Sequence, residues 1–162
     1  MWECGNVGMW ECGNELRPKV RVACDLWQRS TSNPTTVKKA IHPVGAAKPI
    51  APYSPAIEAG GFVFLSGQIA LDPATGELDR KNITAETHRV MRNIGLLLEA
   101  AGLGYEHLVK CTIFLSSMDH YAAVNEVYAT YFPGDPPARE AVAVRTLPRN
   151  VDVEISAIAH RG

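Results

Sequence analysis

The sequence lacks any continuous apolar run near the roughly 20 residues that a helix needs to cross a bilayer, so no membrane span is expected. It also lacks an excess of charge of either sign, because 16 Lys and Arg residues against 17 Asp and Glu residues give a formal net charge of −1. A nearly neutral chain has no general attraction for phosphate backbones or anionic membranes. There is no basic stripe with interleaved aromatic residues either. We therefore expect neither nucleic acid nor a membrane as a partner.

Cysteine is scarce and is not spaced for a metal or redox site. The four cysteines are Cys4, Cys12, Cys24 and Cys111, and no two of them have the C-x-x-C spacing. The amino terminus also has no continuous apolar run of the length that a signal peptide needs. These absences predict a cytoplasmic protein with reduced thiols and no metal site.

What the chain does have is enough apolar residues for one core, since 46% of its 162 residues are hydrophobic. That length and composition predict a single domain. Residues 1–36 are unlike the rest, because the hexapeptide MWECGN occurs twice near the start and a run of Ser, Thr, Asn and Pro follows without a sustained period. We predict that residues 1–36 are an N-terminal extension or linker and that the domain covers residues 37–162.

The periods of the apolar residues predict the element order β β β α β α β β after residue 37. We expect an edge strand and loop within residues 41–51, a hairpin of residues 56–58 and 62–68 around two glycines, a strand at 108–115 and two strands within 137–159. Interleaved strands and helices of this kind favour an α+β fold with the helices on one face of a mixed sheet. The other face then needs a cover, for which oligomerisation is the economical solution.

Two amphipathic helices are expected, at residues 84–101 and about 120–132. The first is assigned Thr84 as N-cap and Gly102 as its stop, and the second is assigned Asp119 as N-cap. On the first helix we place Glu86, Arg89, Arg92 and Asn93 opposite the apolar stripe, and we read His88 as a solvated residue rather than a metal ligand. On the second, the inward stripe is assigned to Tyr121, Val124, Tyr128 and Tyr131 or Phe132.

The candidate chemistry lies in the stretch from Pro137 to Ala159, two strands joined by a proline-bearing turn. Arg139 stands at the entry to its first strand. Glu154 alternates with Val153 and Ile155 in the second, so its side chain points away from the apolar face. If that face is covered, the carboxylate is partly desolvated and suited to proton transfer, and if not, it is simply wet. A structural ion pair is the other reading of these two charges.

Two further positions have a local physical reason to matter. Tyr53 lies between Pro52 and Pro55 on a stiff extended segment that can aim a phenol, although an ordinary half-buried aromatic is equally open. Gly67 falls within the predicted strand 62–68, where glycine often marks a bulge or a close backbone approach.

Several of these segments together resemble the signature of the Rid (YjgF) family of reactive-intermediate deaminases. They are Pro137-Ala138-Arg139, Leu147-Pro148, Val153-Glu154-Ile155-Ser156-Ala157, Pro52-Tyr53-Ser54, Ser66-Gly67-Gln68, Asp72-Pro73 with Gly76, Glu99-Ala100-Ala101-Gly102, and Val124-Asn125 with Tyr128. The resemblance covers nearly all of residues 37–161. It implies a chorismate-mutase-like α+β fold, with two main helices on one sheet face, assembled as a homotrimer around a central β-barrel with active sites between subunits.

The resemblance implies hydrolysis of enamines and imines, such as 2-iminopropanoate and 2-iminobutanoate, to 2-keto acids and ammonia, without a metal or an organic cofactor. Arg139 then matches the residue that holds the substrate carboxylate, and Glu154 the one that orients or activates water. Tyr53 matches a position near the reacting imine, and Ser66 and Asn125 match positions that line the pocket. A small-carboxylate-binding or chaperone-like trimer without turnover remains the alternative.

Three residues depart from the family pattern. Pro55 stands where Gln is common, Ala141 stands where a cysteine is common, and Glu140 is unusual at its position. Ala141 removes any case for a catalytic or redox thiol there, and the departures leave the substrate preference open.

Overall fold

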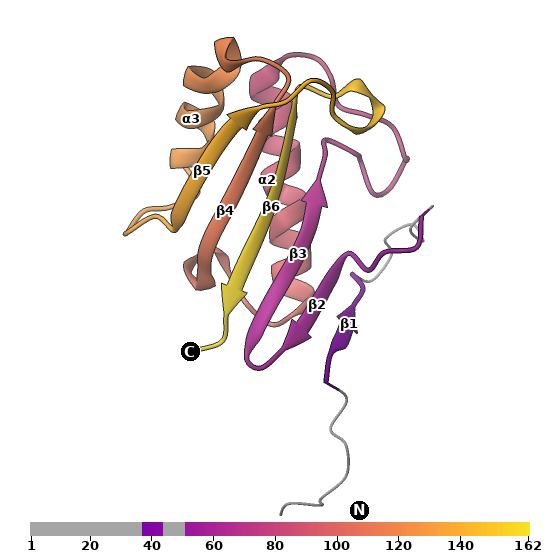
Figure 1. Ribbon diagram of the computed structural model, residues 1–162, viewed down its shortest axis with the longest axis vertical. Helices are drawn as coiled ribbons and strands as arrows, with labels where there is room; N and C mark the ends of the chain where they lie inside the picture. Colours follow the sequence, from indigo (N-terminus) through magenta and orange to yellow (C-terminus); the bar gives the residue numbers. More distant parts are fainter. Residues whose placement is uncertain (1–36, 44–50) are drawn as a thin grey trace, which may run out of the picture. The chain divides into compact units, whose positions relative to one another are not determined.

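The computed structural model describes residues 37–43 and 51–162, which form a mixed six-stranded sheet with two helices on one face (Figure 1). The strands are β1 Lys39–Ile41, β2 Ala56–Ala59, β3 Phe62–Gln68, β4 Leu108–Leu115, β5 Ala138–Ala143 and β6 Val153–His160, and the helices are α2 Ile83–Ala100 and α3 Tyr121–Ala129. The sheet order is β1-β2-β3-β6-β4-β5, with β4 and β5 parallel and the other pairs antiparallel. The predicted α+β class and element order are confirmed.

Some predictions fall outside the part of the chain that the structure describes. The predicted extension of residues 1–36, with Cys4, Cys12 and Cys24, lies there, as do residues 44–50 of the predicted loop. The expected edge strand is present, but it runs from Lys39 to Ile41.

The hairpin of β2 and β3 follows from its glycine pair. Gly60 and Gly61 have φ of 57° and 82°, the two consecutive left-handed residues that a tight hairpin turn of type I′ requires. At its other end β3 carries an irregularity in its register with β6, between Leu65 and Gln68. The predicted hairpin is confirmed, and so is the bulge predicted around Gly67.

The core lies between the sheet and α2. In β6 every second side chain from Val153 to Ala159 is buried, as the alternation predicts. These residues pack in one apolar cluster with the stripe of α2, which includes the fully buried Val90, Met91, Ile94 and Leu98. The strands predicted within residues 137–159 are both present, but β4 lies between them, and β5 forms the sheet edge.

The prediction for the polar face of α2 was wrong at two positions. Glu86 and Asn93 are 1% and 8% exposed. Glu86 Oε1 accepts hydrogen bonds from the backbone N–H groups of Asp152 and Val153, while Asn93 Nδ2 donates to the carbonyls of Ile69 and Leu71. Both side chains are covered by loops distant in sequence, which helical periodicity cannot detect.

Smaller corrections concern the helix starts and His88. The N-cap of α2 is Asn82, whose Oδ1 accepts from the Ala85 N–H, and Thr84 is already inside the helix. Gly102, with φ of 69°, is confirmed as its stop. His88 is half-buried, with Nδ1 2.9 Å from the Tyr131 hydroxyl, rather than freely solvated.

The start of α3 also differs from the prediction. Asp119 lies inside a short 3₁₀ turn, Met118–His120, whose N-cap is Ser117. The 3₁₀ turn precedes the helix, and the predicted stripe is confirmed at Val124 and Tyr128 but not at Tyr121. Val124, Val127 and Tyr128 are buried, whereas Tyr121 is 38% exposed.

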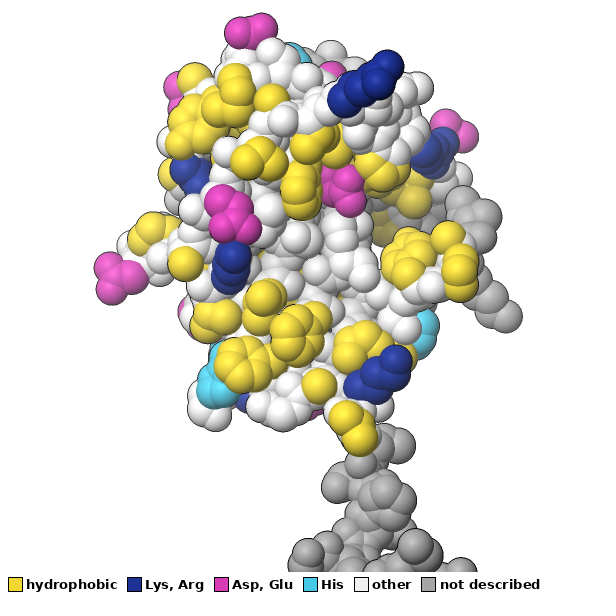
Figure 2. Space-filling model, viewed as in Figure 1, with side chains coloured by type: hydrophobic (Ala, Val, Ile, Leu, Met, Phe, Trp, Pro, Cys, Tyr) yellow, Lys and Arg dark blue, Asp and Glu magenta, His cyan; other side chains and the backbone are white. Residues whose placement is uncertain are grey.

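The sheet face away from the helices is open and partly apolar. Phe62, Phe64 and Val142 are each 40–45% exposed, and pairing registers place Phe64 and Val142 on the same face as Ile158 and Phe114. Figure 2 shows apolar side chains gathered over this face. In the part of the chain that is described, no helix has the length and apolarity to cross a membrane.

Candidate active site

Arg139 lies on the edge strand β5, on the face that the helices cover. It is directly opposite Cys111 of β4, which is fully buried. Directly opposed residues share a sheet face, so the Arg139 side chain rises toward α3 rather than toward the open face. Its position at the sheet edge leaves it half-buried.

One face of α3 holds the Arg139 guanidinium. Nη1 donates to Asn125 Oδ1, and Nη2 donates to the Tyr121 hydroxyl at 3.1 Å. The guanidinium carbon lies 5.1 Å from the centroid of the Tyr128 ring and 5.7 Å from that of Tyr121, within the range of cation–π attraction. Residues 121, 125 and 128 follow helical spacing, so these three side chains meet the same strand. We call Arg139, Tyr121, Asn125 and Tyr128 the arginine cluster.

The structure thus brings Asn125 to Arg139 and adds Tyr121 and Tyr128 to them. Both tyrosines belong to the predicted inward stripe of the second helix. The i, i+4, i+7 spacing of residues 121, 125 and 128 can be read from the sequence. Only the position of β5 beside α3 shows that these side chains contact the Arg139 guanidinium.

Two groups beside the Arg139 guanidinium, the Cys111 thiol and the Tyr128 phenol, are neutral. Burial raises the pKa of the Cys111 thiol, and burial also raises the pKa of the Tyr128 phenol. A cysteine that keeps its proton is a poor nucleophile. Cys111 therefore behaves as a small apolar core residue, since it is fully buried.

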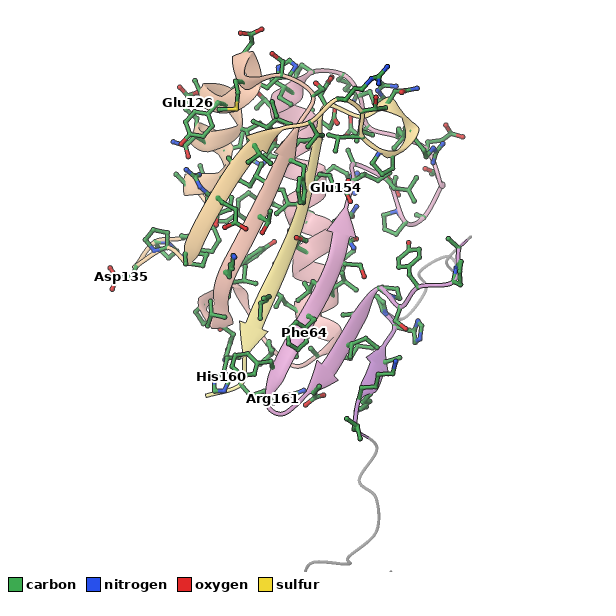
Figure 3. The ribbon with its side chains drawn as sticks, viewed as in Figure 1. Phe64, Glu126, Asp135, Glu154, His160 and Arg161 are labelled. Carbon is green, nitrogen blue, oxygen red and sulfur yellow. The ribbon has the colours of Figure 1, made fainter. Side chains whose placement is uncertain are left out.

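Glu154 lies on the other face of the sheet. In β6 it is directly opposite Phe114, and in Figure 3 it is labelled on the open sheet face. It is half-buried, and burial raises its pKa above the ordinary carboxyl value. A carboxyl group with a raised pKa can give or take a proton nearer to neutral pH. Half-burial and the raised pKa favour the partly desolvated environment, and the cover of this face by a second subunit stays a prediction.

Gly67 makes room for Glu154. A Cβ atom added at Gly67 would overlap Glu154 Oε1 and lie 2.8 Å from Cδ and 3.1 Å from Cγ. The bulged part of β3 therefore lies directly against this carboxyl group, which confirms the close approach predicted for Gly67.

Ser66 links the bulge to the segment that carries Tyr53. Its hydroxyl donates to the Ser54 carbonyl at 2.8 Å, and its backbone N–H donates to the Pro55 carbonyl at 3.0 Å. Tyr53 itself is 53% exposed. We call Glu154, Gly67, Ser66 and Tyr53 the glutamate cluster, because Gly67 lies against Glu154 and the hydrogen bonds of the adjacent Ser66 hold the segment that carries Tyr53.

The two clusters do not meet within one chain. Strand β4 separates β5 from β6, and Arg139 and Glu154 are on opposite faces of the sheet. The predicted crevice that contains both therefore needs a second copy of the chain, and its existence stays a prediction.

Glu140, the neighbour of Arg139, points to the open face. Its Oε1 lies 3.1 Å from Lys110 Nζ and accepts a hydrogen bond of 2.9 Å from the Thr112 hydroxyl. This departure from the family pattern is thus directed away from the arginine cluster. Among the described residues, no group of three or more His, Cys, Asp or Glu side chains could hold a metal ion.

Comparison with known proteins gives matches over most of the chain. The family model for endoribonuclease L-PSP matches residues 44–161. Protein DfrA of Myxococcus xanthus is 52% identical, over 75% of this chain and 95% of its own length. The 2-iminobutanoate/2-iminopropanoate deaminase of Mus musculus is 40% identical, over 78% and 93%. The crystal structure of E. coli TdcF with bound serine superposes with a TM-score of 0.72 at 35% identity, over 76% of this chain and 99% of that one.

Proposed function

Because the chain belongs to the endoribonuclease L-PSP family, which includes the YjgF and RidA proteins, we propose that it hydrolyses 2-imino acids and their enamine forms to 2-keto acids and ammonia. The observation that carries this proposal is the way α3 holds Arg139. A guanidinium has five N–H donors. Two are used by Asn125 and Tyr121 in the described part of the chain, which leaves three for a ligand carboxylate.

The comparisons support the same chemical class. The mouse relative is named for 2-iminobutanoate and 2-iminopropanoate, and TdcF holds serine, an amino acid with a free carboxylate. A planar carboxylate is the natural partner of an arginine fork, because two parallel N–H donors match its two oxygens.

In the proposed reaction, Arg139 holds the carboxylate of R–C(=NH)–COO⁻ and Glu154 accepts a proton from water as the oxygen adds to C2. Glu154 returns this proton to the nitrogen, which gives the tetrahedral intermediate R–C(OH)(NH₂)–COO⁻. The hydroxyl proton then passes through Glu154 to the nitrogen, the C–N bond breaks, and R–CO–COO⁻ and NH₃ leave. Imines hydrolyse readily in water, so substrate positioning together with one acid–base group, worth roughly 10²–10⁴-fold, is enough. Tyr53, on the segment bonded to Ser66, is proposed to lie near the imine.

Arg139→Lys tests the proposal directly. Lysine keeps the charge but loses the two-pronged donor set, so KM should rise roughly 10- to 100-fold, the size of one or two hydrogen bonds to a charged group. The measurement is 2-keto acid and ammonia release from imines generated by an amino-acid oxidase. A wild-type protein that binds 2-oxobutanoate without releasing ammonia would favour the carboxylate-binding alternative.

We further propose that the active site is shared between subunits of a homotrimer, with Arg139 from one subunit and Glu154 from the next. Because the variants Arg139→Lys and Glu154→Gln then damage different halves of each site, unfolding them together and refolding the mixture should restore activity. In a cyclic trimer each mixed assembly contains one intact site of three, which gives about a quarter of the wild-type kcat/KM for random mixing. No recovery in mass-verified mixed trimers would contradict the shared site.

Phe64→Glu should break the assembly. Phe64 is 45% exposed on the open sheet face, where a buried charge without a partner would oppose association. We expect light scattering to give a trimer for the wild type and a smaller species for the variant. Leu96→Glu is the matched control, since Leu96 is 41% exposed on α2, away from this face. The molar mass of the Leu96→Glu assembly should equal that of the wild type.

A further inference from the structure

Tyr121 is the most exposed side chain of the arginine cluster. It is 38% exposed, whereas Tyr128 is 3% exposed beneath the same guanidinium. Its hydroxyl nevertheless has a defined partner, because it accepts a hydrogen bond from Arg139 Nη2 at 3.1 Å. The phenol therefore lies at the rim of the arginine cluster rather than in the core.

Hydrogen bonds hold the guanidinium at both of its terminal nitrogens. Asn125 accepts from Nη1 and Tyr121 accepts from Nη2, while the Tyr128 ring lies 5.1 Å from the guanidinium carbon. A single hydrogen bond would leave a long arginine side chain free to rotate about its remaining bonds. Two hydrogen bonds to different nitrogens define the plane of the fork and the direction of its remaining donors.

We propose that Tyr121 is a positioning residue for carboxylate binding: its hydroxyl fixes the Arg139 fork in the orientation that receives the substrate. The inference rests on the proposed function only in taking a 2-imino acid as the ligand. Because an arginine side chain loses much rotamer freedom when ordered, a fork that is already held binds a carboxylate more tightly. A hydroxyl that accepts from Nη2 also keeps its own proton to donate at the exposed rim.

The first test compares Tyr121→Phe with Tyr131→Phe. Tyr121→Phe keeps the ring but removes the oxygen, so KM for the imine and Kd for 2-oxobutanoate should both rise on the order of tenfold, with kcat within about twofold of wild type. Tyr131→Phe is the matched control, because its hydroxyl pairs with His88 Nδ1 instead, and neither constant should change. A loss confined to kcat, or an equal rise of KM in the control, would overturn the inference.

A second measurement does not depend on turnover. Phenylglyoxal modifies arginine, and peptide mass spectrometry can follow the rate at Arg139 alone. Removing the Tyr121 oxygen frees Nη2, so Arg139 should be labelled several-fold faster in Tyr121→Phe than in the wild type or in Tyr131→Phe. Equal labelling in the three proteins would overturn the inference. If the wild type binds 2-oxobutanoate but produces no ammonia, the proposed deaminase function fails, while Kd and labelling still decide the role of Tyr121.

Discussion

Gly67→Ala should lower kcat by roughly 10²–10⁴-fold, the contribution of one acid–base group, while leaving the protein folded. The new Cβ would overlap Glu154 Oε1, so one of the two must move. The backbone of Gly67 is outside the left-handed region, and alanine can adopt it without strain. Because the overlap involves the end of a flexible side chain, Glu154 should rotate away from its place rather than the sheet breaking. The catalytic carboxylate would be displaced in a protein that remains intact.

Kinetics and unfolding curves on the same samples check this expectation. Glu154→Gln should lose kcat to a similar extent, because an amide cannot accept the proton from water. Gly134→Ala is the matched control, since no atom lies within 4 Å of the added Cβ and Gly134 does not have a positive φ. Wild-type kcat in Gly67→Ala would show that the position of Glu154 against the bulge has no part in the reaction.

The pH dependence gives the same variant a second readout. Burial raises the pKa of Glu154, and a general base must be deprotonated, so the wild-type rate should fall as the pH decreases through this raised value. In Gly67→Ala the displaced carboxylate would be better hydrated, and its pKa should relax toward the ordinary value. The acid limb of the residual rate should therefore shift to lower pH.

Glu86→Leu should lower the free energy of unfolding by about 2–4 kcal/mol, because two backbone N–H groups lose their acceptor. Those groups belong to Asp152 and Val153, at distances of 2.7 and 3.1 Å from Glu86 Oε1, and Val153 is the first residue of the strand that carries Glu154. Leucine would fill the space but leave both donors unsatisfied in a buried place. Urea unfolding at a fixed protomer concentration measures the loss.

Glu86→Gln should behave differently, because the amide oxygen still accepts both hydrogen bonds. Burial raises the pKa of Glu86, so the folded state holds the proton more tightly than the unfolded chain does. The stability from this linkage is present below the unfolded pKa and is lost as the pH rises through the folded one. Glu86→Gln should remove that decline and match or exceed the wild type at neutral pH. Glu99→Gln, at an exposed position of the same helix, should keep the wild-type pH dependence of stability. If Glu99→Gln also removed the decline, Glu86 would not be its cause.

Local patterns predicted most of the secondary structure correctly because their causes are local. The glycine pair at 60–61 and the alternation along β6 depend on backbone geometry and on one buried face, both readable over a few residues. The same reasoning failed at Glu86, which it placed on the solvent face of α2. A carboxylate looks polar in a helical pattern whether water or two backbone N–H groups surround it.

The sequence by itself determined the element order, the apolar faces and the residues of the family signature, among them Arg139 and Glu154. Only the tertiary structure decided that β4 lies between the strands of these two residues and that their side chains leave opposite faces of the sheet. It also decided that Tyr121 meets Arg139 and that Gly67 meets Glu154. The physical reason is that periodicity reports which side of an element is buried, whereas strand order and packing between distant segments determine what each side contacts.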